Sequence, residues 1–251
     1  MTRPLTRAAR IRRVVGITAI LAGIAYLIFA AAPVLRLIDN QAERVFAPSG
    51  KRRDVGAAFI SGEMGLAYGM GARTAPALAA RGVPVLGLSS VVEFAHYHTR
   101  DQVDAVVTRT IRETLAKTGA RRVLLMGQSY GADIVATAAP DLPADLRDKV
   151  AAIVLVVPGT SAFFRADPSN LSYMGTPDAY PAAKLRTLSY APVICIYGTA
   201  ERDSLCPQLA GSRAQIIGLP GGHFLRGDDK TLVARMVGAI DHADPTILDG
   251  R

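Results

Sequence analysis

One stretch decides the fold: Val123-Leu124-Leu125-Met126-Gly127-Gln128-Ser129-Tyr130-Gly131-Ala132-Asp133. Its apolar start predicts a buried strand, which breaks into a G-x-S-x-G turn that opens a helix. Small residues at 127 and 131 let strand and helix approach closely, and the sharp turn lifts the Ser129 hydroxyl out of the sheet. The amides at the helix start, that of Tyr130 foremost, would face an oxyanion formed beside Ser129. The pattern predicts a nucleophilic serine, with an ordinary strand-to-helix turn as the alternative.

The chain around this stretch alternates apolar runs with amphipathic segments. Strands are predicted at 55–60, 83–88, 122–126, 150–156, 192–198 and 215–219, and helices at 68–81, 99–117, 130–139, 143–148 and 230–240. This alternation predicts a mostly parallel sheet with helices on both faces. Residues 158–190 lack a clean period and contain Pro168, Pro177 and Pro181, which is typical of an insertion that covers or shapes a site.

Charge is distributed unevenly along the 251 residues. The net charge is +8, and residues 1–53 carry ten Lys/Arg against two acidic residues. The remaining residues, 54–251, balance 19 basic against 19 acidic side chains. A neutral globular part gives no case for binding nucleic acid, and the basic excess surrounds an apolar segment instead.

That apolar segment runs from Val14 to Leu35, 22 residues without a charge. As a helix it would span about 33 Å, enough to cross a hydrocarbon core of roughly 30 Å. Five arginines precede it, so the positive-inside rule places the N-terminus in the cytoplasm and the rest in the periplasm. A cleaved signal peptide with Ala30-Ala31-Ala32 as its cleavage site is the alternative. The predicted division is a basic tail (1–13), an anchor or signal segment (14–35), a stalk (36–54) and a catalytic domain (55–251).

A serine nucleophile needs a base, and His223 is the strongest candidate. It follows the strand at 215–219 and precedes the last helix, and the glycines at 221 and 222 allow the backbone to turn the ring over the sheet. It also comes after Ser129 in the chain, which is the order of a nucleophile-elbow hydrolase. The predicted fold is therefore the α/β-hydrolase fold.

The acid of the triad should follow the strand at 192–198. Asp203 and Glu201 both lie in its exit loop. Asp203 is preferred because a shorter carboxylate four residues before Pro207 is like the acid turn of many α/β-hydrolases. Its role would be to hold the tautomer of His223 and to stabilise the imidazolium. Glu201 would then be a surface carboxylate paired with Arg202.

Two cysteines occur, Cys195 and Cys206. In a domain outside the cytoplasm such a pair can form a disulfide, and the alternative is two unrelated thiols. No Cys/His cluster has metal-ligand spacing, so the sequence implies no metal and no organic cofactor.

Several motifs together resemble the VirJ/AcvB-type bacterial virulence proteins over about residues 55–240. They are Ser61-Gly62-Glu63, Gly127-Gln128-Ser129-Tyr130-Gly131-Ala132-Asp133, Tyr197-Gly198 with Asp203-Ser204-Leu205-Cys206-Pro207, and Leu219-Pro220-Gly221-Gly222-His223. The resemblance implies an extracytoplasmic α/β-hydrolase that releases lysine or a related amino acid from aminoacylated phosphatidylglycerol. It also implies an association with virulence and type IV secretion.

The chain departs from this family where substrate would be recognised. The loop after the first strand, usually glycine-rich with a tryptophan, is Ser61-Gly62-Glu63-Met64-Gly65-Leu66 here. An oxyanion donor from Gly62, Glu63 or Met64 survives the change, because it is a backbone amide. Glu93 is a candidate contact for a substrate ammonium, and a solvated loop carboxylate is the alternative.

The sequence thus predicts a membrane-anchored serine esterase whose substrate is a membrane phospholipid. Ser129, Asp203 and His223 would form the triad. Two other functions stay open. One is a non-catalytic assembly factor that contacts secretion-system components, and the other is a hydrolase of a soluble or peptidoglycan-linked ester.

Overall fold

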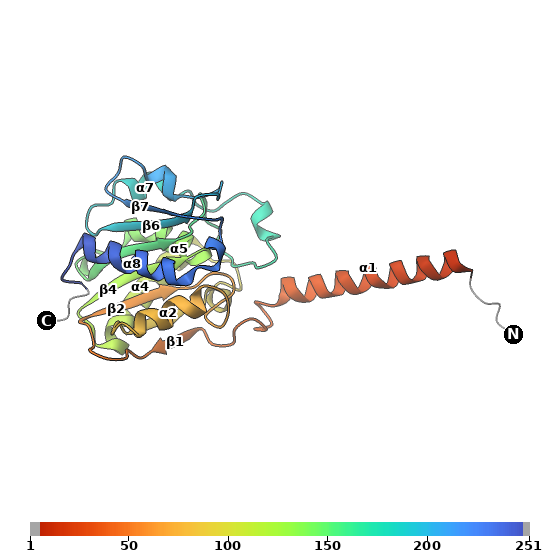
Figure 1. Cartoon of the computed structure of the whole chain (residues 1–251), viewed down its shortest axis with the longest axis horizontal. Helices are drawn as coiled ribbons and strands as arrows, with labels where there is room; N and C mark the ends of the chain where they lie inside the picture. Colours follow the sequence, from red (N-terminus) through yellow and green to blue (C-terminus); the bar gives the residue numbers. More distant parts are fainter. Residues whose placement is uncertain (1–5, 248–251) are drawn as a thin grey trace.

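A seven-stranded sheet forms the centre of the computed structural model, which describes residues 6–247 (Figure 1). The strands are β1 (Glu43–Phe46), β2 (Val55–Ile60), β3 (Val85–Leu88), β4 (Arg122–Gln128), β5 (Val150–Val156), β6 (Val193–Gly198) and β7 (Gln215–Leu219). Their spatial order is β1-β3-β2-β4-β5-β6-β7. All neighbours pair in parallel except β1, which runs antiparallel to β3. The predicted parallel sheet is confirmed.

Helices cover both faces of this sheet. They are α2 (Gly71–Ala79), α3 (Ser90–Glu93), α4 (Arg100–Thr118), α5 (Tyr130–Ala138), α6 (Ala144–Arg147), α7 (Ala182–Arg186) and α8 (Asp229–Ala243). One apolar core lies between the sheet and α4, α5 and α7, and a second lies between the sheet and α2 and α8. In β4, Val123 and Leu125 belong to the first core, whereas Leu124 and Met126 belong to the second. A strand buried on both faces is uniformly apolar, which is the pattern that the sequence shows.

The parallel strands all end at one edge of the sheet. The loops after β2, β4, β5, β6 and β7 therefore meet there, and this carboxyl edge is where α/β sheets bind ligands. In Figure 1 the same edge faces the long helix α1.

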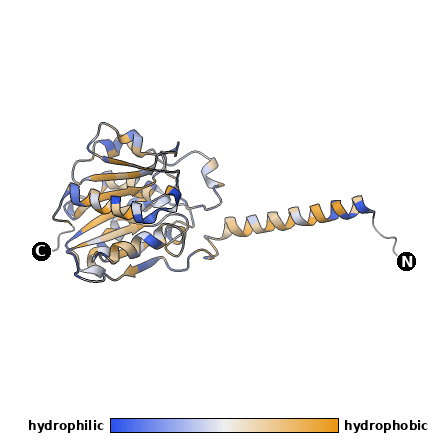
Figure 2. Cartoon of the chain, in the orientation of Figure 1, coloured by the Kyte–Doolittle hydropathy of each residue, from blue (hydrophilic) through white to orange (hydrophobic). Residues whose placement is uncertain are grey.

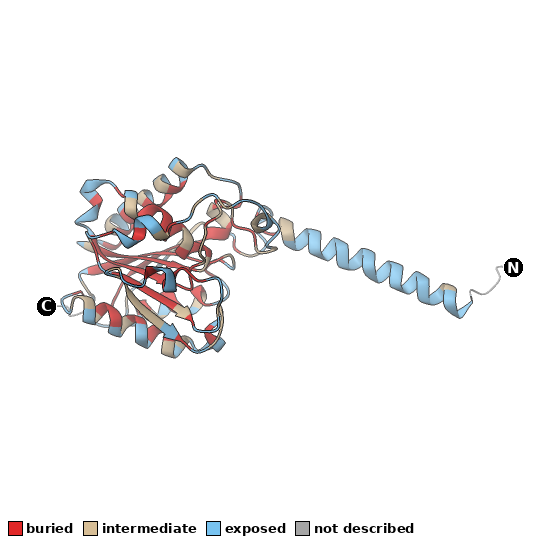
Figure 3. Ribbon diagram, turned by 90° about the horizontal axis from the view of Figure 1, so that it is seen from above, coloured by how far each residue is buried: buried red, intermediate tan, exposed pale blue. Residues whose placement is uncertain are grey.

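Helix α1 (Arg7–Ala31) extends away from the domain as a single 25-residue rod. It begins seven residues before the predicted span, because the arginines continue its helix, and it ends two residues before Pro33, a helix breaker. Its apolar side chains are exposed along its whole middle (Figures 2 and 3). α1 is long and apolar enough to cross a membrane.

The predicted stalk at 36–54 is wrong from Asp39 onwards, because the chain is bonded to the domain from there. Asp39 is 5 % exposed, and its carboxylate accepts hydrogen bonds from the amides of Leu66, at 2.9 Å, and Gln41. Residues 43–46 then form the edge strand β1 beside β3. The polar composition of this segment suits an edge strand with one solvated side, so the domain starts at about Asp39.

Residues 158–190 form the predicted insertion between β5 and β6. It contains the short 3-10 helix η2 (Ser172–Met174) and α7, and Ala162 and Ala179 pair across its base. The exit loop of β6 is tied down by a disulfide between Cys195 and Cys206, whose Cα atoms are 5.4 Å apart. This bridge closes the loop that carries both candidate acids.

Candidate active site

Ser129 lies in the sharp turn between β4 and α5. Its backbone has φ 51° and ψ −126°, a conformation that costs free energy for a residue with a side chain. A Cβ at position 127 would come within 2.2 Å of the Gly131 carbonyl oxygen, and one at 131 within 2.2 Å of the Ile60 oxygen. Both flanking positions therefore require glycine. The strand–turn–helix geometry is that of a nucleophile elbow.

His223 connects the serine to a carboxylate. Ser129 Oγ lies 2.8 Å from His223 Nε2, and His223 Nδ1 lies 2.6 Å from Glu201 Oε1. The hydrogen bond to Glu201 raises the pKa of His223 above its ordinary value, although burial opposes this shift. Serine, imidazole and carboxylate are thus joined in the order that transfers a proton away from the serine hydroxyl.

The preference for Asp203 as the histidine's partner is wrong in this structure. Thr160, in the loop after β5, donates a hydrogen bond to Asp203. Position 201 faces the histidine because a tight turn follows β6, in which Glu201 N bonds Gly198 O and Ala200 N bonds Gly221 O. The longer glutamate side chain then reaches the ring, while the chain at 203 has already moved towards β5.

Two backbone amides are available beside Ser129. The first N–H groups of a helix have no partner inside it, so the Tyr130 amide at the start of α5 is free to bind an anion. Across the site, the Gly62 carbonyl accepts hydrogen bonds from the hydroxyls of Ser61, at 3.0 Å, and Ser90, at 2.7 Å. Because a trans peptide points its C=O and N–H in opposite directions, the Glu63 amide is turned away from Ser90. Gly62, Glu63 and Met64, from which the second oxyanion donor was predicted, all line a cavity at Ser129.

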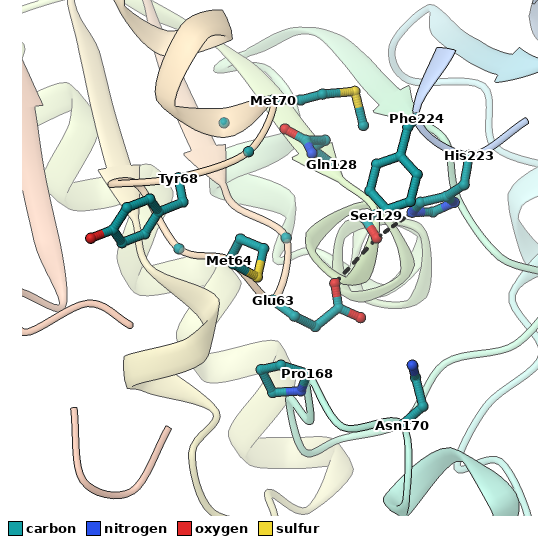
Figure 4. Close-up of a pocket in the computed structure, with 14 residues that line it drawn as sticks. Glu63, Met64, Tyr68, Met70, Gln128, Ser129, Pro168, Asn170, His223 and Phe224 are labelled. Atoms are coloured by element: carbon teal, nitrogen blue, oxygen red, sulfur yellow. Dashed lines mark hydrogen bonds between the residues drawn. The ribbon is translucent and has the colours of Figure 1, made fainter. Parts of the chain in front are cut away.

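The side chain of Glu63 is a feature that sequence reasoning missed. Its Oε2 accepts a hydrogen bond from Ser129 Oγ at 3.2 Å (Figure 4). Its Oε1 accepts one from the Tyr173 hydroxyl, also at 3.2 Å. Figure 4 shows Ser129 between Glu63 and His223. The single proton of the serine hydroxyl therefore has two acceptors, an imidazole and a carboxylate. Only the backbone of Glu63 entered the sequence-based prediction.

An acidic cavity of about 440 Å³ opens on one side of Ser129. Four carboxylates line it, those of Glu63, Asp133, Glu201 and Asp203, and its described lining contains no lysine or arginine. Burial raises the pKa of Asp133 well above its ordinary value, and the charges of Glu63, Asp203 and Glu201 add to this shift. The hydrogen bond from the Gly159 amide opposes it. A cation in this cavity would relieve that repulsion.

A second cavity, of about 360 Å³, lies on the other side of Ser129 and is more apolar. Met64, Tyr68, Met70 and Phe224 contribute to its wall, and Pro168 and Asn170 of the insertion close its far side (Figure 4). Ser129 thus lines both cavities, and we call the first the acidic chamber and the second the apolar mouth.

Glu93, the candidate contact for a substrate ammonium, lines neither of these two cavities. It ends the short helix α3, and its Oε1 lies 2.6 Å from an Arg109 nitrogen on α4. Among residues 6–247, no group of three or more His, Cys, Asp and Glu side chains is arranged to hold a metal ion.

The sheet order, the elbow and the serine–histidine pair define the α/β-hydrolase fold, and solved structures share it. An α/β serine hydrolase homologue from Coxiella burnetii has a TM-score of 0.57 at 18% identity, covering 78% of this chain and 90% of its own. The esterase domain of a Rhodothermus marinus protein has a TM-score of 0.54 at 17% identity, covering 79% and 91%. At such identities the likeness establishes the fold.

A family comparison is more specific. Residues 54–244 match the family described as bacterial virulence protein (VirJ), and the chain belongs to this family. The predicted family resemblance is confirmed over almost the expected range. A search of curated proteins found no match.

Proposed function

We propose that this protein is a membrane-anchored serine esterase that hydrolyses the aminoacyl ester of an aminoacylated phosphatidylglycerol on the periplasmic side of the membrane. The observation that carries the proposal is the acidic chamber beside Ser129, where four acidic side chains line a space whose described lining contains no lysine or arginine. An aminoacyl group presents an ammonium next to its ester carbonyl, so a chamber of this charge selects it over a neutral acyl group. Membership of the VirJ family and the hydrolase fold support the same reading.

The chain's own groups supply each step of the reaction. Ser129 Oγ attacks the aminoacyl carbonyl while its proton passes to His223 Nε2, and Glu201 stabilises the imidazolium through Nδ1. The amides of Tyr130 and Glu63 stabilise the oxyanion. The proton on His223 then leaves with the glycerol hydroxyl of the lipid, and an acyl-serine remains. Water, deprotonated by His223, releases the amino acid and restores Ser129.

The ammonium group also helps to activate the serine in this scheme. Without substrate, the hydroxyl proton of Ser129 has Glu63 as an alternative acceptor to His223. A substrate ammonium bound to Glu63 occupies that carboxylate, which leaves His223 as the acceptor. A cationic acyl group therefore favours the reactive hydrogen bond, whereas a neutral one does not.

Glu63→Gln tests the role of the acidic chamber. We expect the ratio of kcat/KM for the aminoacyl lipid to that for an uncharged acyl ester of similar length to fall at least ~10-fold, because a charged hydrogen bond is lost. The full chain, reconstituted in nanodiscs, is assayed with both esters.

The matched control is Glu93→Gln, which removes an equal charge outside both cavities. Its ratio should stay within twofold of the wild type. Equal losses on both esters in Glu63→Gln would show that Glu63 does not distinguish the ammonium.

The pH profile follows from the hydrogen bond to Glu201. Neutral His223 is the active base, and the bond to Glu201 raises the pKa of that imidazole above its ordinary value. We therefore expect kcat/KM to fall on the acid side with an apparent pKa above about 6.5, and to level off at higher pH. An acid limb below that value would contradict the assignment.

Lipid profiling of a deletion strain tests the substrate itself. Loss of the protein should raise the aminoacyl-phosphatidylglycerol content of the membrane, and restoring the wild-type chain should reverse it. An unchanged profile together with fluorophosphonate labelling of Ser129 would favour a soluble or peptidoglycan-linked ester. An unchanged profile without labelling would favour a non-catalytic role with secretion-system components.

A further inference from the structure

Exposed apolar side chains of the domain gather at the mouth beside Ser129. Met64, Tyr68 and Phe224 line that mouth and are 41 %, 57 % and 75 % exposed. Leu171 and Met174 follow Asn170 of its far wall along the insertion and are 48 % and 83 % exposed. Single exposed apolar residues are common on protein surfaces, but a group around one opening marks an interaction surface. We call these five side chains the apolar rim.

The insertion tip that carries Leu171 and Met174 is held firmly. The Asp167 carboxylate, 4 % exposed, accepts hydrogen bonds from the amides and the hydroxyls of both Ser169 and Ser172. Burial alone would raise the pKa of Asp167, but these four bonds hold it below its ordinary value. The tip is thus a fixed turn that keeps Leu171 and Met174 in solvent.

The inner side of the same tip belongs to the active site. The Tyr173 hydroxyl accepts a hydrogen bond from the Asp167 amide at 3.0 Å and donates one to Glu63 at 3.2 Å. The Tyr173 ring also packs against Phe163, with centroids 4.9 Å apart. The short helix η2 therefore points Tyr173 into the acidic chamber and Met174 away from the protein.

Helix α1 leaves the domain beside this rim. The Tyr26 hydroxyl lies 3.5 Å from the Ser169 carbonyl oxygen, so the insertion tip touches the helix. After α1, Asp39 is fixed to the Leu66 amide in the loop that forms one wall of the mouth. Figure 1 shows α1 departing from the side of the domain where η2 projects. Only residues 32–38 separate the end of α1 from Asp39, which is bonded to that loop.

We propose that the apolar rim rests in the outer leaflet of the membrane that α1 crosses, so that a lipid ester passes from the bilayer directly into the mouth beside Ser129. The tip meets α1 at Tyr26, five residues before the helix ends, which is about 7.5 Å along its axis. Interfacial protein segments bury their apolar face roughly 5–10 Å into the headgroup boundary. The distance along α1 from its end to the contact at Tyr26 falls in this range. Continuity with α1 identifies a lipid surface as the occupant of the rim.

This proposal deepens the proposed function, because it supplies the route by which a lipid reaches Ser129. The two can nevertheless fail separately. The contact of the rim with lipid is measurable without turnover, and an esterase that takes its substrate from water would need no such contact.

Fluorescence depth measurement tests the contact. The full chain carrying Met174→Cys, labelled with an environment-sensitive dye, is reconstituted in nanodiscs with and without lipids brominated along the acyl chains. Both native cysteines are buried in the disulfide and do not label. We expect a blue-shifted emission that brominated lipid quenches at least ~2-fold, as for a probe at the headgroup boundary.

Asp148→Cys is the matched control, because Asp148 is exposed before β5, at the opposite edge of the sheet. Its dye should emit as in water and stay unquenched. The proposal is overturned if the dye at 174 behaves like the dye at 148. A blue shift at 174 without quenching would mean that protein, not lipid, covers the rim.

A kinetic test uses the double variant Leu171→Asp/Met174→Asp. Neither side chain lines either of the two cavities beside Ser129, so hydrolysis of a soluble ester should change less than twofold. Hydrolysis of the ester in the bilayer should fall at least ~5-fold, because two carboxylates resist entry into the interface. Val45→Asp, an equally exposed apolar position on β1, should leave both rates unchanged. Equal losses on the two substrates by the double variant would contradict the proposal.

Discussion

Replacing Ser129 with alanine should lower kcat by at least ~10³-fold, because every later step depends on the bond that its Oγ forms. His223→Ala should have an effect of similar size, since the two residues act as one unit at a 2.8 Å separation. Both rates are measured on the full chain in nanodiscs, with an aminoacyl lipid and with a soluble ester. Fluorophosphonate labelling should disappear in Ser129→Ala.

The control for this experiment is Ser161→Ala. Ser161 lines the acidic chamber but has no bond to His223, so labelling and turnover should persist. The unfolding temperature of Ser129→Ala should be close to that of the wild type. The serine hydroxyl does little to stabilise the strained backbone at this position, where φ is 51°. A Ser129→Ala protein that keeps its rate would exclude the acyl-serine route.

The central fold was predictable because local and global requirements agree in it. A G-x-S-x-G turn after an apolar run fits one geometry, in which both glycines avoid contacts of 2.2 Å with backbone oxygens. The strand at 150–156 is apolar at every position because both faces of β5 are buried. In such segments one sequence pattern corresponds to one structure.

The missed features depend on where the chain goes in three dimensions. Glu201 and Asp203 have the same charge and lie in one loop, and only the turn at Gly198 decides which of them faces His223. Likewise, Asp39 looks like a polar linker residue until the Leu66 amide is found beside it. The sequence motif singles out the backbone amide of Glu63. The residues next to Glu63 in the sequence do not indicate that its carboxylate contacts Ser129.

Replacing Glu201 with glutamine should also be severely damaging, lowering kcat by roughly 10²–10⁴-fold. A glutamine of the same shape can offer an N–H to His223 Nδ1 and so favour the wrong tautomer. It also removes the charge that stabilises the imidazolium. Asp203→Asn is the matched control, since Asp203 bonds Thr160 and has no bond to the ring. Its loss should stay below ~10-fold, the size of one hydrogen bond.

The pH profile separates this role of Glu201 from a structural one. The hydrogen bond to Glu201 raises the pKa of His223, so its loss must lower that pKa. The acid limb of kcat/KM should therefore move to lower pH in Glu201→Gln and stay in place in Asp203→Asn. If Glu201→Gln lowered the rate only by loosening the exit loop, the acid limb would stay in place. The disulfide between Cys195 and Cys206 limits such loosening. If Asp203→Asn moves the acid limb and Glu201→Gln does not, then Asp203 is the carboxylate that bonds His223 in solution.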